Sequence, residues 1–423
     1  MSNREKMNIA VIGSGVSGLV SSLILSRKHN ITIFEKCSYL GGHVHTHKMK
    51  DDDGVLNVDS GFIVYNENTY PNFIKLMKLL NVETQNTSMG FSYSDGNDFE
   101  YSGNSINSLF AKKTNFVSLN FYLFIYNILK FNKIALKDLD NLDINVKLID
   151  YLKTNKISKE LIEKYIIPMG SAIWSTDPET MKDMPARFFI RFFKNHGLLD
   201  VRNRPQWKVI KNGSFQYVKK IYKELKKNNA KIFLNHNVKE VSRVKDKVII
   251  KIKGKDEIFF DKVIFACHSN QALQIIKNIT PEEKNILSNI KYQNNTATIH
   301  TDTNILPRRK KAWSSWNYLS VNKDERVVLT YNMNILQGLK SKNIFCVTIN
   351  DPGLIEQGKI IKTINYSHPL FSESSVTAQS QKDLINGKNN TFFSGAYWGY
   401  GFHEDGVNSA LDVCNYFNMS LNG

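Results

Sequence analysis

One short glycine loop constrains the fold of this chain more than any other feature. Its sequence is Gly13-Ser14-Gly15-Val16-Ser17-Gly18, and it follows the apolar run Asn8 to Ile12. A helical segment, Val16 to Lys28, overlaps its end, and a β-rich run, Ile31 to Phe34, leads into Glu35. Strand, glycine loop, helix and strand at this spacing predict a Rossmann βαβ unit that binds a dinucleotide.

Each glycine of the loop has a separate physical purpose. Gly13 allows the tight turn, Gly15 lets the backbone approach a pyrophosphate, and Gly18 lets the helix pack against the strand. The phosphate charge then lies at the positive end of the helix. Glu35 can accept hydrogen bonds from ribose hydroxyls, and its charge disfavours the 2′-phosphate of NADP. A glycine turn without a ligand is disfavoured, because the strand, helix and acid all accompany it.

A second glycine turn follows closely. Gly41 and Gly42 lie within Tyr39 to Thr46, and the segment Val58 to Phe62 (VDSGF) comes next. A turn at this place brings more backbone near the cofactor. It favours FAD over NAD.

These motifs resemble a known group of proteins. The glycine loop, Glu35, the LGG turn and VDSGF are similar to the FAD-dependent amine oxidase and phytoene desaturase superfamily. More narrowly, the chain resembles a bacterial family of predicted NAD/FAD-binding proteins often found near cyclopropane-fatty-acid synthase-like methyltransferases, which implies lipid chemistry. The matching stretches cover nearly the full length: Val58 to Pro71, Ile167 to Thr176, Arg191 to Leu199, Arg204 to Trp207, His300 to Thr303, Pro307 to Tyr318 and Ser394 to Gly406.

The resemblance implies a set of FAD contacts. Val238 fits the position whose backbone contacts adenine, and Gly395 starts the C-terminal flavin-binding segment. Two departures concern the same site: His43 stands where many members carry Arg, and Asp405-Gly406 replaces a common Gly-Ala pair. The full implied set is Gly13, Ser14, Gly15, Gly18, Glu35, Lys36, Gly41, Gly42, His43, Val238, Gly395, Asp405 and Gly406.

The order of segments predicts an α/β protein with a discontinuous Rossmann-type FAD-binding domain and an inserted α+β substrate domain, as in amine oxidases. A chain of 423 residues exceeds what one core usually serves, and 42% hydrophobic residues indicate a folded protein. We expect the FAD-binding domain in residues 1–88, 206–292 and 390–423. We expect the substrate domain in residues 89–205, which are predicted to be helical, and 293–389.

Three residues are candidates for catalysis. The strand-like segment Thr296 to Thr301 lacks the lysine that many amine oxidases carry near the flavin, which disfavours a true amine oxidase. His300 on that segment could act as an acid or base, although an ordinary hydrogen-bonded histidine is favoured. Tyr397 and His403 bound an aromatic, glycine-rich stretch that we expect beside the flavin; its alternative is core packing.

The alternating His43, His45 and His47 could suit a metal, but no fourth ligand is indicated and we predict no metal site. The net charge of +17 is spread along the chain. We interpret it first as solubility, although a basic surface also attracts anionic lipid or nucleic acid. Trp313 and Trp316 beside Arg308 to Lys311 fit either the mouth of a site for an amphipathic anion or a solvated basic loop.

The stretch Phe116 to Phe131 is the most apolar in the chain, but polar residues interrupt it, so it is not predicted to span a bilayer. We favour a buried helix over an acyl-tunnel lining or a membrane-docking surface. The polar N-terminus predicts no secretory signal. Four widely separated cysteines suit a reducing compartment, so we expect a cytoplasmic protein with possible membrane association.

These observations predict an FAD-dependent oxidoreductase. It takes hydride from a C–H bond of an apolar small molecule or lipid, such as a modified or unsaturated fatty acyl chain. The alternatives are an FAD-dependent double-bond isomerase and a true amine oxidase. Last comes a basic RNA- or membrane-binding protein with structural FAD, since no specific nucleic acid partner is expected. The oligomeric state is not predicted.

Overall fold

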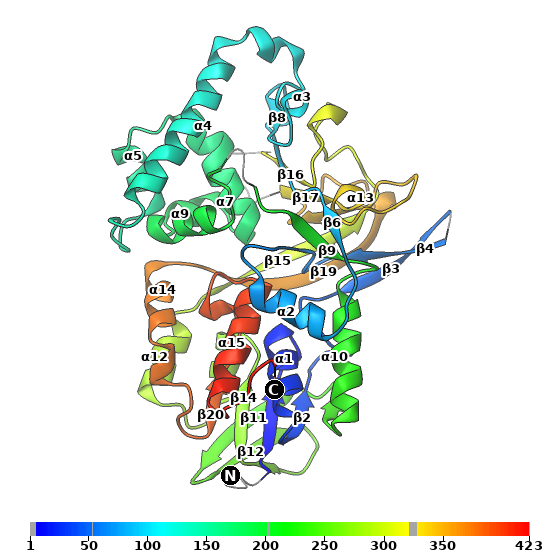
Figure 1. The fold of residues 1–423 in the computed structure, drawn as a ribbon, viewed down its shortest axis with the longest axis vertical. Helices are drawn as coiled ribbons and strands as arrows, with labels where there is room; N and C mark the ends of the chain where they lie inside the picture. Colours follow the sequence, from blue (N-terminus) through cyan, green and yellow to red (C-terminus); the bar gives the residue numbers. More distant parts are fainter. Residues whose placement is uncertain (1–5, 53, 201–203, 321–327, 423) are drawn as a thin grey trace.

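The computed structural model describes residues 6–52, 54–200, 204–320 and 328–422. Two halves lie one above the other in Figure 1, and each is built from distant parts of the sequence. The lower half is built on a parallel sheet and contains the first described strand and the last described helix. The upper half is built on a larger sheet with a group of helices at its side.

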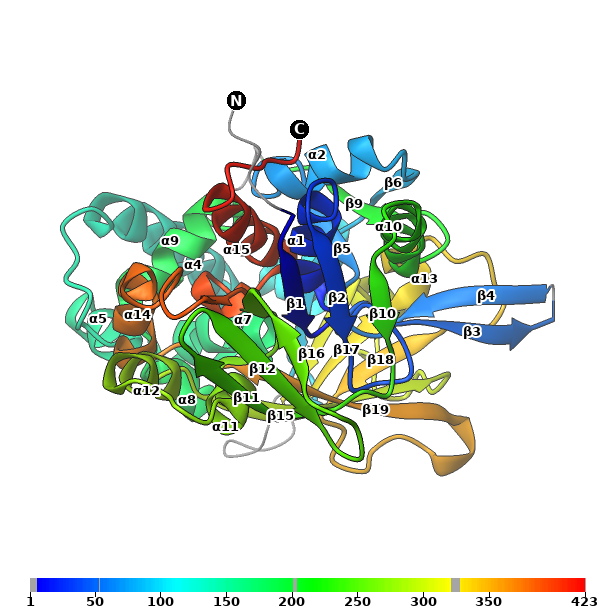
Figure 2. The ribbon, with the colours of Figure 1, turned by 90° about the horizontal axis from the view of Figure 1, so that it is seen from below.

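The lower half is a parallel sheet of five strands in the order β10-β2-β1-β14-β20. Alternate residues point to opposite faces, so Ile9 and Val11 pack against helices, while Ala10 and Ile12 pack toward a second, antiparallel sheet (Figure 2). Burial of both faces explains the nearly continuous apolar runs. The strands are β1 (Asn8–Ile12), β2 (Asn30–Phe34), β10 (Lys231–Phe233), β14 (Lys262–Phe265) and β20 (Thr391–Phe393).

Helices cover one face of this sheet and a three-stranded sheet with short helices covers the other. The first group is α1 (Val16–Leu25), α2 (Pro71–Leu79), α10 (Phe215–Lys227) and α15 (His403–Asn415). The second is β11 (Val238–Val244), β12 (Lys247–Ile252), β13 (Ile258–Phe260), α11 (Ser269–Ile275), α12 (Pro281–Ser288) and α14 (Glu373–Ser380).

The upper half contains a seven-stranded sheet in the order β19-β15-β18-β17-β16-β7-β8. One face is apolar and packs against helices, as Ile299, Leu329 and Val347 show. The opposite face carries the hydroxyls of Thr330 and Thr348. The strands are β7 (Phe91–Ser94), β8 (Glu100–Ser102), β15 (Tyr292–His300), β16 (Trp316–Leu319), β17 (Val328–Asn332), β18 (Cys346–Ile349) and β19 (Ile360–Pro369).

The helices of the upper half come from one continuous stretch of the chain, and smaller strands join the halves. The helices are α3 (Ile106–Leu109), α4 (Leu119–Asp138), α5 (Leu148–Thr154), α6 (Lys159–Leu161), α7 (Ile167–Trp174), α8 (Pro178–Lys182) and α9 (Ala186–Asn195), with α13 (Met333–Leu336) elsewhere. The hairpin β3 (Thr46–Asp51) and β4 (Gly54–Asp59) and the sheet of β5 (Val64–Asn66), β9 (Trp207–Ile210) and β6 (Thr84–Thr87) complete the fold.

The α/β class and the discontinuous parallel sheet are confirmed, because strands from three separate segments pair in it. The five domain boundaries stay predictions. One prediction was incomplete: residues 89–205, expected to be helical, begin with β7 and β8, which complete the upper sheet. The interpretation of Phe116 to Phe131 as a buried helix was also half wrong, because one side of α4 is exposed.

Candidate active site

The candidate site lies where the carboxyl ends of the parallel strands meet the upper sheet, the position at which such sheets bind ligands. The loop after β1 contacts the segment after β20 through Ser17 Oγ, which donates to the Ser394 carbonyl at 3.2 Å. The second glycine turn joins them, because the Gly41 N–H donates to the Ser14 carbonyl at 3.0 Å. Three separate stretches of sequence therefore converge on one place.

The three loop glycines differ in what surrounds them. Gly13 has a φ of +104°, and a Cβ there would lie 2.6 Å from the Ala266 oxygen. A Cβ on Gly18 would lie 2.2 Å from the Gly13 oxygen. By contrast, a Cβ on Gly15 would meet nothing within 4 Å. Gly13 and Gly18 thus serve turn and packing, and Gly15 presents an open backbone face.

Helix α1 begins at this open face without a side-chain cap. Gly15 is its N-cap residue and has no side chain to accept from the first helical N–H groups. The free N–H groups and the helix dipole favour an anion at this position. The geometry fits a pyrophosphate.

Glu35 lies beside the same loop. Its Oε2 accepts from the N–H of Ser14 at 2.9 Å and from Ser14 Oγ at 2.7 Å, and its Oε1 accepts from the Cys37 N–H at 2.8 Å. The His236 N–H donates to the Glu35 carbonyl at 2.8 Å, which brings the segment before Val238 to this end of the site. The carboxylate is therefore held at the end of β2, where the sequence predicts a ribose contact.

A cluster of histidines and tyrosines forms the other end of the site. The ring of His43 lies 5.1 Å from Tyr366, 5.4 Å from His368 and 5.8 Å from His268, measured between ring centroids. His268 in turn stacks on Tyr292 at 4.6 Å. Apart from His43, these residues were not predicted from the sequence, because they come from three further segments that only the fold brings together.

The imidazoles of this cluster are neutral near pH 7. Burial lowers the pKa of His43, and it lowers the pKa of His368 to about 3. For His268, burial is the main cause that lowers the pKa to about 3, and a second cation beside His43 and Lys36 would also be repelled. His43 therefore offers hydrogen bonds in place of the positive charge that an arginine would bring. Lys36, which follows Glu35 directly, is exposed.

Two buried polar atoms at the site have no hydrogen-bond partner among the described residues. They are His43 Nε2 and His45 Nδ1. Buried polar atoms are nearly always paired in native proteins. Atoms of this kind fit a ligand with many hydrogen-bonding groups.

A chain of hydrogen-bonding groups links the cluster to the surface. Tyr366 OH lies 2.7 Å from Ser60 Oγ, which lies 2.9 Å from His47 Nε2. His47 Nδ1 lies 3.4 Å from the amine of the exposed Lys362. Hydroxyl and imidazole groups exchange protons readily, so this arrangement can connect solvent with Tyr366. The described residues hold no group of three or more His, Cys, Asp or Glu side chains placed for a metal.

Comparison with known proteins identifies the family. Residues 16–333, most of the chain, match the family of flavin containing amine oxidoreductases. The chain belongs to this family. It is therefore an FAD-dependent, amine oxidase-like oxidoreductase, and the open Gly15 face, the uncapped helix and Glu35 fit the pyrophosphate and ribose of FAD.

Individual relatives add the fold but not the substrate. Over 53 residues the chain is 45% identical to tryptophan 2-monooxygenase of Allorhizobium ampelinum (strain ATCC BAA-846 / DSM 112012 / S4), and the match spans 12% of this chain and only 7% of that protein. The crystal structure of the CLA-producing fatty acid isomerase from P. acnes has a TM-score of 0.70 at 14% identity, over 98% of this chain and all of that one. Cyclohexylamine oxidase from Brevibacterium oxydans IH-35A has a TM-score of 0.69 at 13% identity, over 98% of this chain and 100% of that one.

His300 lies away from the histidine cluster of this flavoprotein. Alternate residues of a strand share one sheet face, so His300 lies on the same face of β15 as Thr298 and on the face opposite Ile299. Its Nε2 lies 2.7 Å from Thr348 Oγ1, and its Nδ1 accepts from the Asp302 N–H at 3.1 Å. Burial lowers its pKa to about 4. This placement favours the ordinary hydrogen-bonded histidine over the catalytic one.

His403 and Tyr397 are both buried beside the glycine-rich C-terminal segment. The His403 ring stacks on Phe62 with centroids 3.5 Å apart, and its Nε2 lies 3.1 Å from Tyr217 OH. Tyr397 packs in the core cluster on the other side of the parallel sheet. A Cβ on Gly395 would lie 2.3 Å from the Tyr397 ring. Their predicted roles in catalysis stay predictions.

The first turn of α15 packs closely on its neighbours. Asp405 Oδ2 accepts from the Phe402 N–H at 2.9 Å, and burial raises the pKa of Asp405 to about 7. A Cβ on Gly406 would lie 2.5 Å from Val16 Cγ1, so this glycine lets α15 approach α1. Glu404 accepts from two N–H groups at the start of α2. The predicted cofactor contacts of Asp405 and Gly406 are not tested by these neighbours.

Aromatic side chains form a wall between the upper helices and the C-terminal segment. Phe188 on α9 lies 4.6 Å from Tyr400 and 4.9 Å from Phe371. Phe192 lies 4.7 Å from Trp174. The sequence signal was present in the resemblance, since Trp174 and Phe192 fall within its matching stretches, but no role was assigned to them.

Proposed function

We propose that this flavoprotein takes hydride from a C–H bond of an apolar substrate of the fatty acyl class. The observation that carries the proposal is the aromatic wall of Trp174, Phe188, Phe192, Phe371 and Tyr400. Phe188 and Tyr400 are its half-buried members, and an alkyl chain that packs on them removes apolar surface from water.

Three carboxylates on the segments that meet at the C-terminal end of the parallel sheet are poorly suited to hold a cationic amine. Asp59 accepts from the Ser214 N–H at 2.9 Å, Asp405 from Phe402, and Glu404 from Phe73 at 2.8 Å. Each is thus engaged by the backbone. The strand β15 also carries no lysine. These features favour a lipid over an amine substrate.

The reaction balances as a desaturation or a related oxidation. When bound, FAD accepts the hydride and passes two electrons to dioxygen or a quinone. The adjacent carbon loses a proton, so a C–C single bond becomes a double bond. The chain of Tyr366, Ser60 and His47 offers a route for that proton to Lys362 and solvent.

The narrower resemblance supports the same substrate class. Proteins of the bacterial family that this chain resembles are often found near cyclopropane-fatty-acid synthase-like methyltransferases, which modify acyl chains. We include a cytoplasmic location and contact with a membrane surface in the proposal. The shared fold does not choose between fatty acids and amines, since both occur among the similar structures.

Anaerobic mixing tests the proposal directly. FAD-loaded protein is mixed with saturated, monounsaturated and cyclopropane-containing phospholipids, and separately with primary amines, while the visible absorbance of the oxidised flavin is recorded. We expect bleaching with one lipid class only, and product analysis should show loss of two hydrogens. Bleaching by amines alone, or by nothing, would overturn the proposal. Rearranged double bonds without net bleaching would identify an isomerase.

A variant pair locates the effect at the aromatic wall. Phe188→Ala removes a half-buried ring of the wall, whereas Phe215→Ala removes a half-buried ring on α10 outside it. We expect the first to lower kcat/KM for the acyl substrate at least tenfold and the second to leave it within about twofold, because one aromatic contact is worth roughly 1.5–3 kcal/mol. Equal effects would argue against the wall as the substrate surface.

A further inference from the structure

The end of the molecule farthest from the parallel sheet carries a large exposed apolar surface, which we call the tip. It is formed by α3, the short 3-10 helix Lys113–Val117 and the first half of α4. Val117 is 88% exposed, Leu119 73% and Ile106 72%. The other exposed apolar residues of the tip are Phe116, Tyr122, Leu123, Tyr126 and Leu129.

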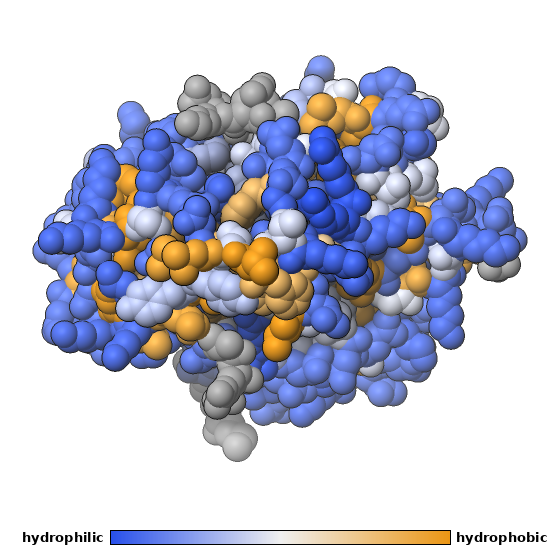
Figure 3. Space-filling model, turned by 90° about the horizontal axis from the view of Figure 1, so that it is seen from above, coloured by the Kyte–Doolittle hydropathy of each residue, from blue (hydrophilic) through white to orange (hydrophobic). Residues whose placement is uncertain are grey.

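Helix α4 is apolar on both sides at this end. Phe121 and Phe124 face the core, as expected for a surface helix. The opposite side should be polar, but it carries Leu119, Leu123 and Tyr126. Figure 3, which looks onto this end, shows apolar side chains gathered across the middle of the face with hydrophilic ones around them. A contiguous patch of this kind marks an interaction site.

The tip is preformed. The rings of Phe110 and Phe116 stack at 4.3 Å, and Tyr122 lies 5.8 Å from Phe110. Tyr122 OH also donates to the Phe116 carbonyl at 3.2 Å. Rings held in this way need little ordering when they meet a partner.

The charge around the tip is positive. Residues 101–137 contain five lysines and no aspartate or glutamate. Lys130, Lys133 and Lys137 continue the exposed side of α4 beyond its apolar half, at about 1.5 Å per residue. The basic loop around the 3-10 helix Lys310–Ala312, with exposed Arg308, packs beside α3.

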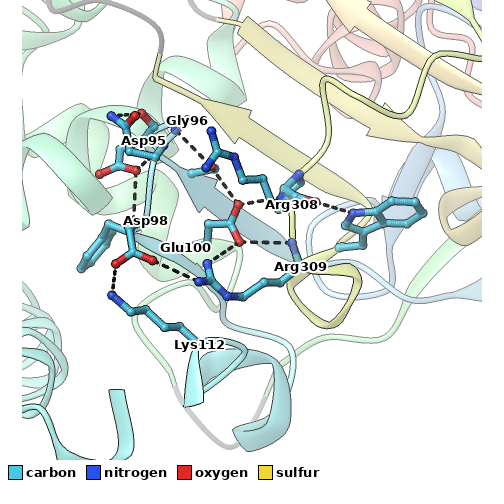
Figure 4. A network of polar contacts seen from close by, with 12 residues as sticks. Asp95, Gly96, Asp98, Glu100, Lys112, Arg308 and Arg309 are labelled. Carbon is cyan, nitrogen blue, oxygen red and sulfur yellow. Dashed lines mark hydrogen bonds and ion pairs between the residues drawn. The ribbon is translucent and has the colours of Figure 1, made fainter. Parts of the chain in front are cut away.

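Two nearby acids are already neutralised within the protein. Buried Glu100 accepts from the N–H groups of Arg308 and Arg309 and from the Arg309 side chain at 3.1 Å (Figure 4). Asp98 pairs with Arg309 at 3.0 Å and with Lys112. The remaining exposed cations at this end therefore meet little local negative charge.

We propose that the tip docks on an anionic lipid surface. An apolar end with interfacial tyrosines, bordered by lysines, matches the acyl region and the phosphate layer of such a surface. None of the helices in the described ranges is long and apolar enough to cross a membrane, so the contact is peripheral. The inference deepens the lipid-directed function proposed above, but vesicle binding is measured without turnover, so each can fail alone.

Vesicle sedimentation tests the docking surface. FAD-loaded protein is mixed with vesicles of phosphatidylcholine alone or with phosphatidylglycerol added, and bound protein is measured against lipid concentration. We expect tighter binding to the anionic vesicles and weakening by salt. Leu119→Asp with Leu123→Asp should weaken binding at least a hundredfold, because each leucine that enters the lipid contributes about tenfold or more to the affinity.

The matched control is Val244→Asp with Phe259→Asp, two exposed apolar residues on the three-stranded sheet at the other end of the molecule (Figure 1). It should bind vesicles as the unchanged protein does. A reporter covers the case in which the tip variant fails to fold. Brominated lipid should quench the fluorescence that Val117→Trp adds to that of the five native tryptophans. It should not quench the fluorescence that Val244→Trp adds.

Three outcomes would overturn the proposal. They are no binding to either vesicle, equal binding by the tip variant, or equal quenching of both tryptophan reporters. A further result would be a dimer in light scattering that dissociates when the tip is substituted, together with no vesicle binding. That result would assign the surface to a second copy of the chain and reject the lipid partner.

Discussion

Replacing Gly15 by alanine separates cofactor binding from folding. Gly15 has φ −65° and ψ 179°, which alanine adopts without strain, and the added Cβ meets nothing within 4 Å of the protein. Alanine makes the unfolded chain less flexible, which stabilises the folded protein by about 0.4–1 kcal/mol. Alanine is also a poorer N-cap than glycine, which destabilises the folded protein by a similar amount. The free energy of unfolding of the flavin-free protein should therefore change by less than about 1 kcal/mol.

FAD binding should respond very differently. The Cβ would occupy the open face that we assign to the pyrophosphate, and would push it from the N–H groups at the start of α1. Loss of one or two charge-assisted hydrogen bonds, each worth about 1.5–3 kcal/mol, raises the Kd for FAD by roughly tenfold to ten-thousandfold. Gly18→Ala is the contrast, because its Cβ would lie 2.2 Å from the Gly13 oxygen and should destabilise the fold itself.

The assay combines urea unfolding of the flavin-free protein, followed by circular dichroism, with titration of FAD followed by flavin fluorescence. Unchanged unfolding with weakened binding for Gly15→Ala supports the assignment. Wild-type FAD affinity in that variant would refute it, as would a loss of stability equal to that of Gly18→Ala. In the first case the cofactor does not approach Gly15; in the second the open face is not open.

Three further substitutions test other parts of the structure. Asp59→Ala leaves the Ser214 N–H and other donors without an acceptor, so urea unfolding should show a loss of about 2–5 kcal/mol; less than 1 would contradict the contacts. Burial raises the pKa of Asp405 from 3.8 to about 7, so the folded protein keeps a proton that the unfolded chain releases, and stability falls as pH rises through this range. Asp405→Asn should flatten that fall in unfolding measured from pH 4 to 8, and equal slopes would reject the shifted pKa. His300→Gln should cost about 1–2 kcal/mol through its lost bond to Thr348, with turnover and FAD affinity within about twofold; a hundredfold loss of kcat at intact stability would restore a catalytic role.

Features of the fold that depend on local sequence were predictable. The βαβ unit from β1 to β2 is a short continuous segment with its own turn and periodicity, and both of its strands lie within one residue of the ends that the sequence predicts. By contrast, β7 and β8 were missed. Ser92 on β7 pairs with Asn317 on β16, 225 residues away, and no local pattern reports such a partner.

The site divides along the same line. Gly13, Gly15 and Glu35 belong to one motif whose spacing carries the chemistry. The cluster around His43 does not, since Tyr366 and His368 are placed by the pairing of β19 with β15. His300 was a candidate because it is a histidine on the expected strand. The alternation of side chains along β15 places it on the sheet face opposite Ile299, where it contacts Thr348.

A single core connects the tip with the aromatic wall. The buried face of α4, with Phe121 and Phe124, belongs to the same apolar cluster as Phe192 and Phe371 of the wall. Moving ten methylenes of an acyl chain through water would cost on the order of 8 kcal/mol. If the tip rests in a lipid surface, an acyl chain that leaves that surface close to this half of the molecule spends less of its length in water. Docking surface and aromatic wall thus border one continuous apolar core of the upper half.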